Sequence, residues 1–341
     1  MRMKKLGNTG LVVSEVCMGT MTFGNGEGVW ATIGKMDQTT VDNIVKTALD
    51  AGVNFFDTAD VYSNGQAELM TGYAFANLGI PRDQYVVGTK VLGRTGPGTN
   101  QMGLSRLHVL HAVDASLRRL QLDYIDLYQV HGYDPLTPLE ETLDALDDCV
   151  RAGKVRYIGL SNLAAWQVAK SLWISDKRGL ARFESVQAYY SLAGRDIERE
   201  IVPLATDQRL AILPWSPLAG GLLSGKYSRD GSGPEGARRA AFDFPPADKE
   251  RAFRIVEAMR PIAQAHDCSV AQIALAWLLH QPHVTSVIIG AKTRDQLLDN
   301  LKSTDVKLSA EEIQKLNDVS ALPSEYPAWM LDRLSIDRRT A

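Results

Sequence analysis

Four polar residues follow segments that have the composition of buried strands: Asp57, Tyr62, Lys90 and His131. An unperturbed phenol titrates near about 10, so Tyr62 can serve as a general acid near neutral pH only if its pKa is lowered. A lysine ammonium about 4 Å away, at an effective dielectric constant of about 20, would favour the phenolate by up to about 4 kcal/mol. Lys90 is the candidate that could supply this charge.

The other two residues would complete a proton-donating group. A buried ammonium is costly unless it is paired, and Asp57 could hold Lys90 charged and in place. His131 could share a hydrogen bond with a substrate oxygen and orient it. Each residue alone has a purely structural interpretation, such as a helix cap for the aspartate. Together, on three successive strand ends, they favour a proton donor aimed at a developing alkoxide.

The elements that must position these residues can be read from residue 16 to residue 303. Short apolar runs, typical of buried strands, alternate there with stretches whose apolar residues recur every three or four positions, as in helices. Strands are expected at Val16–Gly19, Asn54–Phe56, Tyr85–Lys90, Tyr124–Val130, Val155–Leu160, Glu184–Tyr189, Leu210–Trp215 and Thr285–Ile289. Apolar stripes predict helices over Val41–Leu49, Leu107–Leu120, Leu139–Val150, Leu163–Trp173, Val256–Ile262 and Val270–Trp277. Gly52, Gly79 and Gly153 stand where helices should end.

Strands that alternate with helices imply parallel βαβ units, and eight of them favour an α/β fold of the (β/α)8 TIM-barrel type. An open doubly wound sheet is the alternative. No GxGxxG follows the first strand, which argues against a Rossmann domain. We expect one domain over residues 1–341, with its core at about 16–303 and a C-terminal helix (Glu311–Val319) and tail within 304–341. An irregular stretch, Ser216–Asp248, interrupts the alternation of strands and helices and is expected to be functional.

Composition narrows the classes of partner. The net charge of −3 gives no sign of nucleic acid or of a membrane surface. No apolar run reaches the roughly 20 residues that span a bilayer, so the sequence predicts a soluble, cytoplasmic protein. Three scattered cysteines predict reduced thiols. His108 and His111 lie three apart without a third ligand, so we expect no metal site and place both on the surface.

Several segments resemble the signature segments of the aldo-keto reductase superfamily. They are Asp57-Thr58-Ala59-Asp60-Val61-Tyr62, Gly88-Thr89-Lys90, Asp126-Leu127-Tyr128-Gln129-Val130-His131 and Gly159-Leu160-Ser161-Asn162. Residues 6–11 and 18–24 resemble the N-terminal hairpin and first strand of the same family, in the branch that includes bacterial reductases and potassium-channel β subunits. The resemblance runs in order from residue 3 to about residue 320, which makes it specific.

This resemblance implies a barrel that binds NADPH and reduces a small ketone or aldehyde, or catalyses the reverse oxidation. Tyr62 would be the general acid, with Lys90 and Asp57 tuning it and His131 positioning the carbonyl. Trp30 would join Tyr62 and His131 in contacting the substrate. The implied cofactor contacts are Thr20, Met21, Asp57, Ser161, Asn162, Gln187, Trp215, Ser216, Pro217, Leu218, Gly220, Lys226, Gly290, Lys292, Thr293, Arg294, Gln296, Asp299 and Asn300.

Roles within this set follow from the same resemblance. Trp215 would stack on the nicotinamide, and Lys292 and Arg294 could pair with a 2′-phosphate, which favours NADPH over NADH. An apolar pocket lining is suggested by Phe23, Trp30, Tyr133, Tyr189 and Trp329. Two alternative functions remain open at this point. One is a redox-sensing NADPH-binding accessory subunit with slow turnover, and the other is a barrel lyase or isomerase that needs no nicotinamide.

Overall fold

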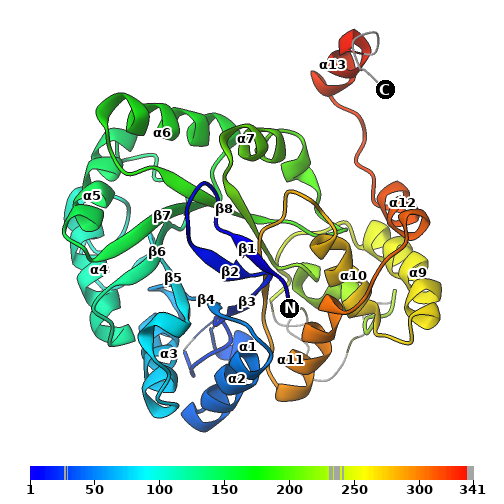
Figure 1. The fold of residues 1–341 in the computed structure, drawn as a ribbon, viewed down its shortest axis with the longest axis horizontal. Coiled ribbons are helices and arrows are strands. Elements are labelled where there is room, and N and C mark those ends of the chain that lie inside the picture. Colours follow the sequence, from blue (N-terminus) through cyan, green and yellow to red (C-terminus); the bar gives the residue numbers. More distant parts are fainter. Residues whose placement is uncertain (27, 29, 230–232, 234–238, 240–241, 336–341) are drawn as a thin grey trace.

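Eight parallel strands form a ring at the centre of the computed structural model, which describes residues 1–26, 28, 30–229, 233, 239 and 242–335 (Figure 1). The strands are β3 (Val16–Gly19), β4 (Phe55–Asp57), β5 (Val86–Val91), β6 (Ile125–Val130), β7 (Val155–Ser161), β8 (Phe183–Tyr189), β9 (Ala211–Trp215) and β10 (Val287–Ile289). Each is paired with its neighbour in chain order, and β10 pairs with β3. A bridge between Ile212 and Val284 links the remaining edge. The predicted (β/α)8 barrel is therefore confirmed, and the open doubly wound sheet is excluded.

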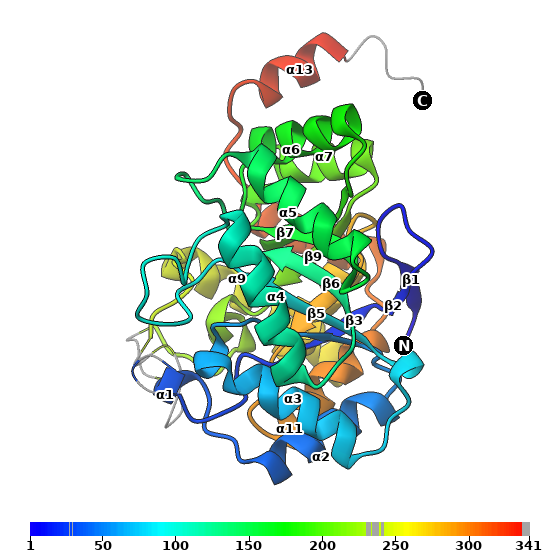
Figure 2. The same cartoon turned by 90° about the vertical axis from the view of Figure 1, so that its left-hand side faces the viewer.

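Helices surround the ring and follow the strands in turn (Figures 1 and 2). They are α1 (Trp30–Ile33), α2 (Gln38–Asp50), α3 (Gln66–Asn77), α4 (Arg106–Leu120), α5 (Leu139–Arg151), α6 (Ala165–Arg178), α7 (Ile201–Gln208), α9 (Lys249–Ala265), α10 (Val270–Leu279) and α11 (Arg294–Leu301). Local signals set their ends. Asp37 caps α2 by accepting a hydrogen bond from the Thr40 N–H. Gly52 and Gly79 follow α2 and α3 with positive φ, as predicted.

An antiparallel hairpin of β1 (Met3–Lys5) and β2 (Val12–Ser14) lies across one end of the ring, as expected (Figure 1). Its apolar residues Leu6 and Val13 are fully buried in a cluster with inward-facing strand residues such as Phe55. Gly7 lets the hairpin approach, because a Cβ there would lie 2.2 Å from the Glu184 carbonyl oxygen. The hairpin thus closes the end of the barrel where the strands begin, and the end where they finish is left for the site.

One predicted apolar stripe, on α6, lies on the outer face of its helix and not against the barrel. The segment Leu163–Trp173 does form α6, but Trp166 and Trp173 are 60% and 58% exposed. The face that packs on the barrel instead carries Val168 and Leu172. Both sets have helical spacing, so periodicity alone could not distinguish them. The surface assignment of His108 is also wrong, because this residue of α4 is buried.

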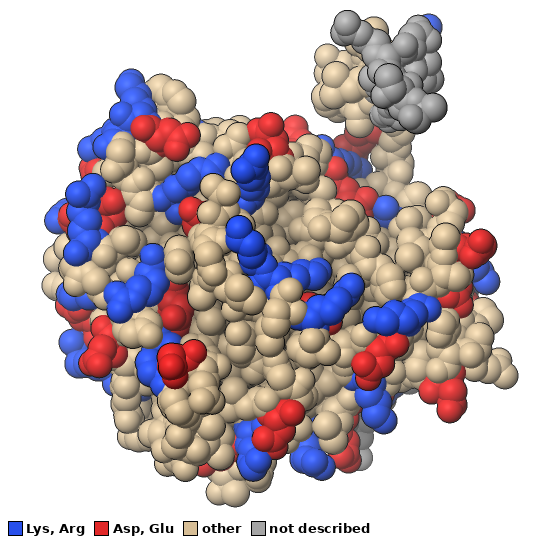
Figure 3. Space-filling view, viewed as in Figure 1, with Lys and Arg blue, Asp and Glu red and all other residues tan. Residues whose placement is uncertain are grey.

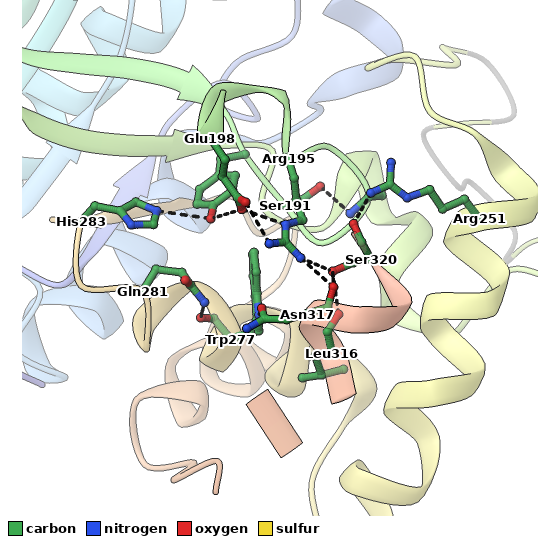
Figure 4. Close-up of polar contacts among 12 residues, drawn as sticks. Ser191, Arg195, Glu198, Arg251, Trp277, Gln281, His283, Leu316, Asn317 and Ser320 are labelled. Atoms are coloured by element: carbon green, nitrogen blue, oxygen red, sulfur yellow. Dashed lines mark hydrogen bonds and ion pairs between the residues drawn. The ribbon is translucent and has the colours of Figure 1, made fainter. Parts of the chain in front are cut away.

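The C-terminal segment begins with the predicted helix, α12 (Ala310–Val319), which is anchored by Arg195 from the loop after β8 (Figure 4). The Arg195 guanidinium donates two hydrogen bonds of 2.8 Å to Glu198 and reaches the Asn317 carbonyl at 3.0 Å. Glu198 also accepts from the Tyr190 hydroxyl at 2.7 Å. A further helix, α13 (Ala328–Ser335), stands apart from the barrel in both ribbon views, and the end of the tail lies outside the described residues.

Charges of both signs are interspersed over the hairpin face (Figure 3). Cys17, Cys149 and Cys268 are free thiols, as predicted. No helix among the described residues is long and apolar enough to span a membrane. The same part of the chain contains no group of three or more His, Cys, Asp and Glu side chains arranged to hold a metal ion.

Candidate active site

The ammonium of Lys90 is the centre of the predicted catalytic group. It donates to the Asp57 carboxylate at 2.6 Å, to the Thr58 carbonyl at 2.8 Å and to the Tyr62 hydroxyl oxygen at 3.2 Å. Lys90 is fully buried and Asp57 is 2% exposed. Lys90 extends from β5 and Asp57 ends β4, while Tyr62 begins a short 3₁₀ turn (Tyr62–Gly65). The structure therefore brings these three side chains together where adjacent strands end.

Electrostatics keep this group charged. Burial disfavours the ammonium of Lys90, but the Asp57 carboxylate and the Tyr62 oxygen outweigh it and raise the pKa of Lys90 above its ordinary value. The second oxygen of Asp57 accepts from the side-chain amides of Gln129 at 3.0 Å and Gln187 at 2.8 Å. Asp57 thus has a partner on each oxygen, which is what a buried carboxylate requires.

His131 follows β6 directly and faces the same phenol. Its ring meets the Tyr62 ring edge-on, with 5.8 Å between the centroids. Burial, reinforced by the Lys90 charge, lowers the pKa of His131 to about 3. The imidazole is therefore neutral near pH 7 and can donate one hydrogen bond without carrying charge.

These side chains open into a cavity of about 340 Å³ at the carboxyl ends of the strands. All three residues predicted to contact the substrate, Trp30, Tyr62 and His131, line it. The Trp30 ring lies 5.8 Å from the Tyr62 ring. Nine predicted cofactor residues also line this cavity: Met21, Asp57, Ser161, Asn162, Gln187, Trp215, Ser216, Pro217 and Gly290.

A second cavity, of about 510 Å³, continues from the first. Thr22, Ser216, Pro217 and Gly290 line both, so the two form one channel leading away from Tyr62. The other predicted cofactor residues on its wall are Leu218, Gly220, Lys226, Lys292, Gln296, Asp299 and Asn300. Three predicted contacts are absent from both walls. Thr20 is fully buried, Thr293 caps α11, and Arg294 is exposed on α11.

The cavity beside Tyr62 carries polar side chains on its wall. The Ser161 hydroxyl lines it and is buried without a hydrogen-bond partner in the described part of the chain. The Thr20 hydroxyl has no such partner either, but it lies outside both walls. Asn162 accepts from the Trp215 indole at 3.1 Å and donates to the His131 carbonyl at 2.9 Å. This bond fixes the edge of the Trp215 ring against the loop that carries Asn162. An elongated polar ligand with a planar aromatic end fits these residues.

Sequence reasoning missed three residues at the site. Gln129 supports Asp57, and the signal for it was a polar side chain, besides Asp126, inside a strand of mainly apolar residues. Phe242 and Phe244 line the substrate cavity. They belong to the irregular stretch Ser216–Asp248, which has neither helical nor strand periodicity in its sequence. Among the suggested aromatic residues, Phe23 is fully buried and Tyr133 packs beside Trp166, 6.4 Å away.

Two more of the suggested residues lie away from the cavity wall. Tyr189 stands behind Trp215, with 5.2 Å between the ring centroids. Trp329 belongs to α13, and the cavity's lining residues include none from that helix.

A buried carboxyl group lies beside the catalytic group. Both oxygens of Asp60 are buried without a well-aligned hydrogen bond to any described residue. Burial, and then the nearby Glu68 carboxylate, raise the pKa of Asp60 to about 8. The carboxyl is therefore largely protonated at neutral pH.

Comparison with known proteins follows this geometry. A profile described as Aldo/keto reductase family matches residues 15–321. The chain is 38% identical to an uncharacterized oxidoreductase, YrpG, of Bacillus subtilis, over 95% of this chain and 98% of that protein. It is 37% identical to a probable voltage-gated potassium channel subunit beta of Arabidopsis thaliana, over 90% and 92% of the two chains.

A fungal relative has a more specific name. The versiconal hemiacetal acetate reductase of Aspergillus parasiticus is 35% identical, over 93% of this chain and 96% of that protein. Together, the match along most of the chain, the closed barrel and the hydrogen-bonded lysine, aspartate and tyrosine give a consistent result. The chain belongs to the aldo/keto reductase family.

Proposed function

We propose that this protein is an NADPH-dependent reductase that converts a ketone or aldehyde to an alcohol, or catalyses the reverse oxidation. The observation that carries the proposal is the hydrogen bond of 3.2 Å between the buried Lys90 ammonium and the Tyr62 hydroxyl oxygen, at the wall of the cavity. A phenol in that position can give up its proton to a substrate oxygen, because the ammonium stabilises the phenolate left behind.

The neighbouring residues have separate tasks in this mechanism. Asp57 keeps Lys90 charged, and Gln129 and Gln187 keep Asp57 in position. His131, which is neutral, can donate a hydrogen bond to the carbonyl oxygen and aim it at Tyr62. The bound nicotinamide would supply the hydride. Proton donation and hydride transfer together balance the two-electron reduction of a carbonyl.

The channel residues support a role in cofactor binding. Ser161, Asn162 and Gln187 would hold the carboxamide of the nicotinamide, and the Trp215 ring would lie against its face. Gly220 has a φ of +66° and allows the backbone to approach a pyrophosphate closely. Lys292 stands at the far end of the channel, and Arg294 follows it on α11. Lys292 on that wall, with Arg294 exposed nearby, favours NADPH through its 2′-phosphate.

The second candidate is a redox-sensing accessory subunit with slow turnover. It is favoured by one observation, the 37% identity to a protein named as a probable potassium channel subunit beta. The catalytic group described above fits both functions, because a sensor of this kind would also bind the cofactor.

Turnover separates the two candidates. NADPH oxidation would be followed at steady state with a panel of aldehydes and ketones, and the same panel would be repeated with NADH. Rapid reduction of at least one carbonyl supports the reductase. Tight NADPH binding, read from quenching of tryptophan fluorescence, with no rapid turnover on any compound supports the sensor. Failure to bind NADPH would favour a lyase or isomerase.

A further inference from the structure

Part of the wall of the substrate cavity is aromatic. Phe244 lies parallel to Trp215, with 5.8 Å between the ring centroids and 7° between the planes. Phe242 continues the stack, 5.4 Å from Phe244. We call Trp215, Phe242 and Phe244 the aromatic wall. Phe244 remains 39% exposed, so this large apolar side chain lies at the mouth of the cavity and not in the core.

Among its described residues, the rest of the cavity wall offers a substrate no ion-pair partner. The ionisable side chains on its described wall are Asp57, Tyr62 and His131. Asp57 is occupied by Lys90 and two amides, and His131 is neutral. A carboxylate or ammonium on the substrate would lose its water without gaining an ion pair there.

One buried arginine holds the aromatic wall in place without entering the cavity. The Arg239 side chain is 5% exposed, and its guanidinium donates to the Ala219 carbonyl at 3.0 Å. The same group binds the Asp243 carboxylate and the Pro245 carbonyl, on either side of Phe244. Arg239 thus ties the chain around Phe244 to the turn that follows β9.

The turn after β9 and the chain at Phe244 approach each other closely at Gly220. A Cβ at Gly220 would lie 2.5 Å from the Phe244 carbonyl oxygen, and the φ of +66° also excludes most side chains. The turn that bears Gly220 therefore contacts the Phe244 backbone directly, and Arg239 binds the residues before and after Phe244.

We propose that Phe242 and Phe244 are specificity-determining residues that select carbonyl compounds carrying an uncharged, flat aromatic ring, and that Arg239 is the positioning residue that holds them. This inference rests on the proposed function. The substrate ring would stack on Phe242 and Phe244 while its carbonyl oxygen meets Tyr62, and the Trp215 ring would remain available to the nicotinamide. Aromatic stacking favours such rings over aliphatic groups of similar size.

The test compares benzaldehyde with propanal, at saturating NADPH, in the wild type and in Phe244→Ala, Phe242→Ala and Arg239→Met. We expect Phe244→Ala to lower kcat/KM for benzaldehyde about tenfold, mainly through KM, and to change that for propanal less than about twofold. Phe242→Ala should act in the same direction. Phe244→Leu is the control for loss of volume, and it should lose the same preference. Equal losses for both aldehydes would overturn the proposal.

Arg239 is tested through its dependence on Phe244. Arg239→Met should reproduce the KM effect on benzaldehyde, and the double variant with Phe244→Ala should be no worse than Phe244→Ala alone. Arg239→Lys keeps a charge but not the planar fork, so it should give an intermediate effect. An unchanged benzaldehyde KM in Arg239→Met, or additive losses in the double variant, would refute the positioning role.

Two further measurements separate this inference from the proposed function. 4-Carboxybenzaldehyde should be reduced at least about tenfold less efficiently than benzaldehyde by the wild type, and equal efficiency would overturn the selection against charge. Benzamide binding to the NADP⁺ complex, followed by tryptophan fluorescence, does not depend on turnover. Tight binding that requires Phe244, in a protein that reduces nothing, would sustain the inference and refute the reductase. Carbonyl reduction without any preference for a ring would do the reverse.

Discussion

The ammonium of Lys90 stands 3.2 Å from the hydroxyl oxygen of Tyr62, and both are held where two adjacent strands of the barrel end. The lysine is fully buried, so its charge acts on the phenol with little screening by water. The cost of burying it is offset by the Asp57 carboxylate on its other side. Four predictions test this arrangement and its surroundings.

Removing the phenolic hydroxyl should stop the proton step alone. Tyr62→Phe should lower kcat for carbonyl reduction about 10²- to 10⁴-fold, while the Kd for NADPH changes less than about twofold, because the hydroxyl serves the substrate oxygen. The rate of NADPH oxidation at steady state measures kcat, and fluorescence titration measures the Kd for NADPH. Tyr73→Phe, at a 43% exposed position on α3, is the matched control. A Tyr62→Phe variant with wild-type kcat would show that another group donates the proton.

The Lys90–Asp57 pair should behave as a unit in stability. Lys90→Met should lower the free energy of unfolding by about 3–5 kcal/mol, because it leaves the buried Asp57 carboxylate without a cation. The double variant with Asp57→Asn should recover much of this loss. Urea unfolding provides the measurement. Lys46→Met breaks an ion pair whose side chains are 59% and 64% exposed, and should cost less than about 1 kcal/mol. A double variant less stable than Lys90→Met would contradict the pairing.

Lys292 should distinguish the two nicotinamide cofactors. Its backbone N–H bonds the Gln296 side chain at 2.9 Å, and the residue lines the far cavity. Lys292→Ala should weaken NADPH binding at least about tenfold and NADH binding less than about twofold, because only NADPH carries a 2′-phosphate. Lys302→Ala, outside that cavity, is the control. Similar losses for both cofactors would remove this contact from the proposal.

Asp60 should make stability depend on pH. Its pKa in the folded protein, about 8, lies above the ordinary value of 3.8, so the folded state holds the proton more tightly than the unfolded state. The free energy of unfolding should therefore fall as pH rises from about 4 to about 8, by up to a few kcal/mol from this group. Asp60→Asn should be more stable than the wild type near pH 8 and show a smaller fall.

Urea unfolding at about pH 5 and about pH 8.5 would measure the Asp60 effect. Asp123→Asn, at an exposed position, is the control, and it should leave the pH dependence unchanged. An identical slope in Asp60→Asn and the wild type would mean that Asp60 is not the group responsible.

The sequence predicted the barrel, and the convergence of Asp57, Tyr62, Lys90 and His131 at one end of it, for a geometric reason. Parallel strands of one sheet finish at the same end, so polar residues that follow them must converge. Which face of a helix packs against the barrel was less predictable. Trp166 and Trp173 have the spacing of a buried stripe, yet they lie on the outer face of α6, because Val168 and Leu172 fill the inner one.

Of the aromatic wall, only Trp215 was predicted, and its two phenylalanines could not be. Phe242 and Phe244 belong to a segment without a period, and their positions depend on a contact between Arg239 and Ala219, twenty residues earlier. No local pattern encodes such a contact. The support of Asp57 by Gln129 and Gln187 is also a property of the closed ring, since these residues come from β4, β6 and β8.

The anchoring of α12 by Arg195 has a consequence for biosynthesis. Arg195 donates a hydrogen bond to the Asn317 carbonyl, 122 residues later in the chain. Arg195 belongs to the loop that follows Tyr189 at the end of β8, and the Tyr189 ring lies 5.2 Å from that of Trp215. A nascent polypeptide emerging from the ribosome has already exposed every strand before α12 leaves the exit tunnel. The Tyr189 ring behind Trp215 and the loop that follows it therefore gain the support of Arg195 only after all eight barrel strands and α12 have been synthesised.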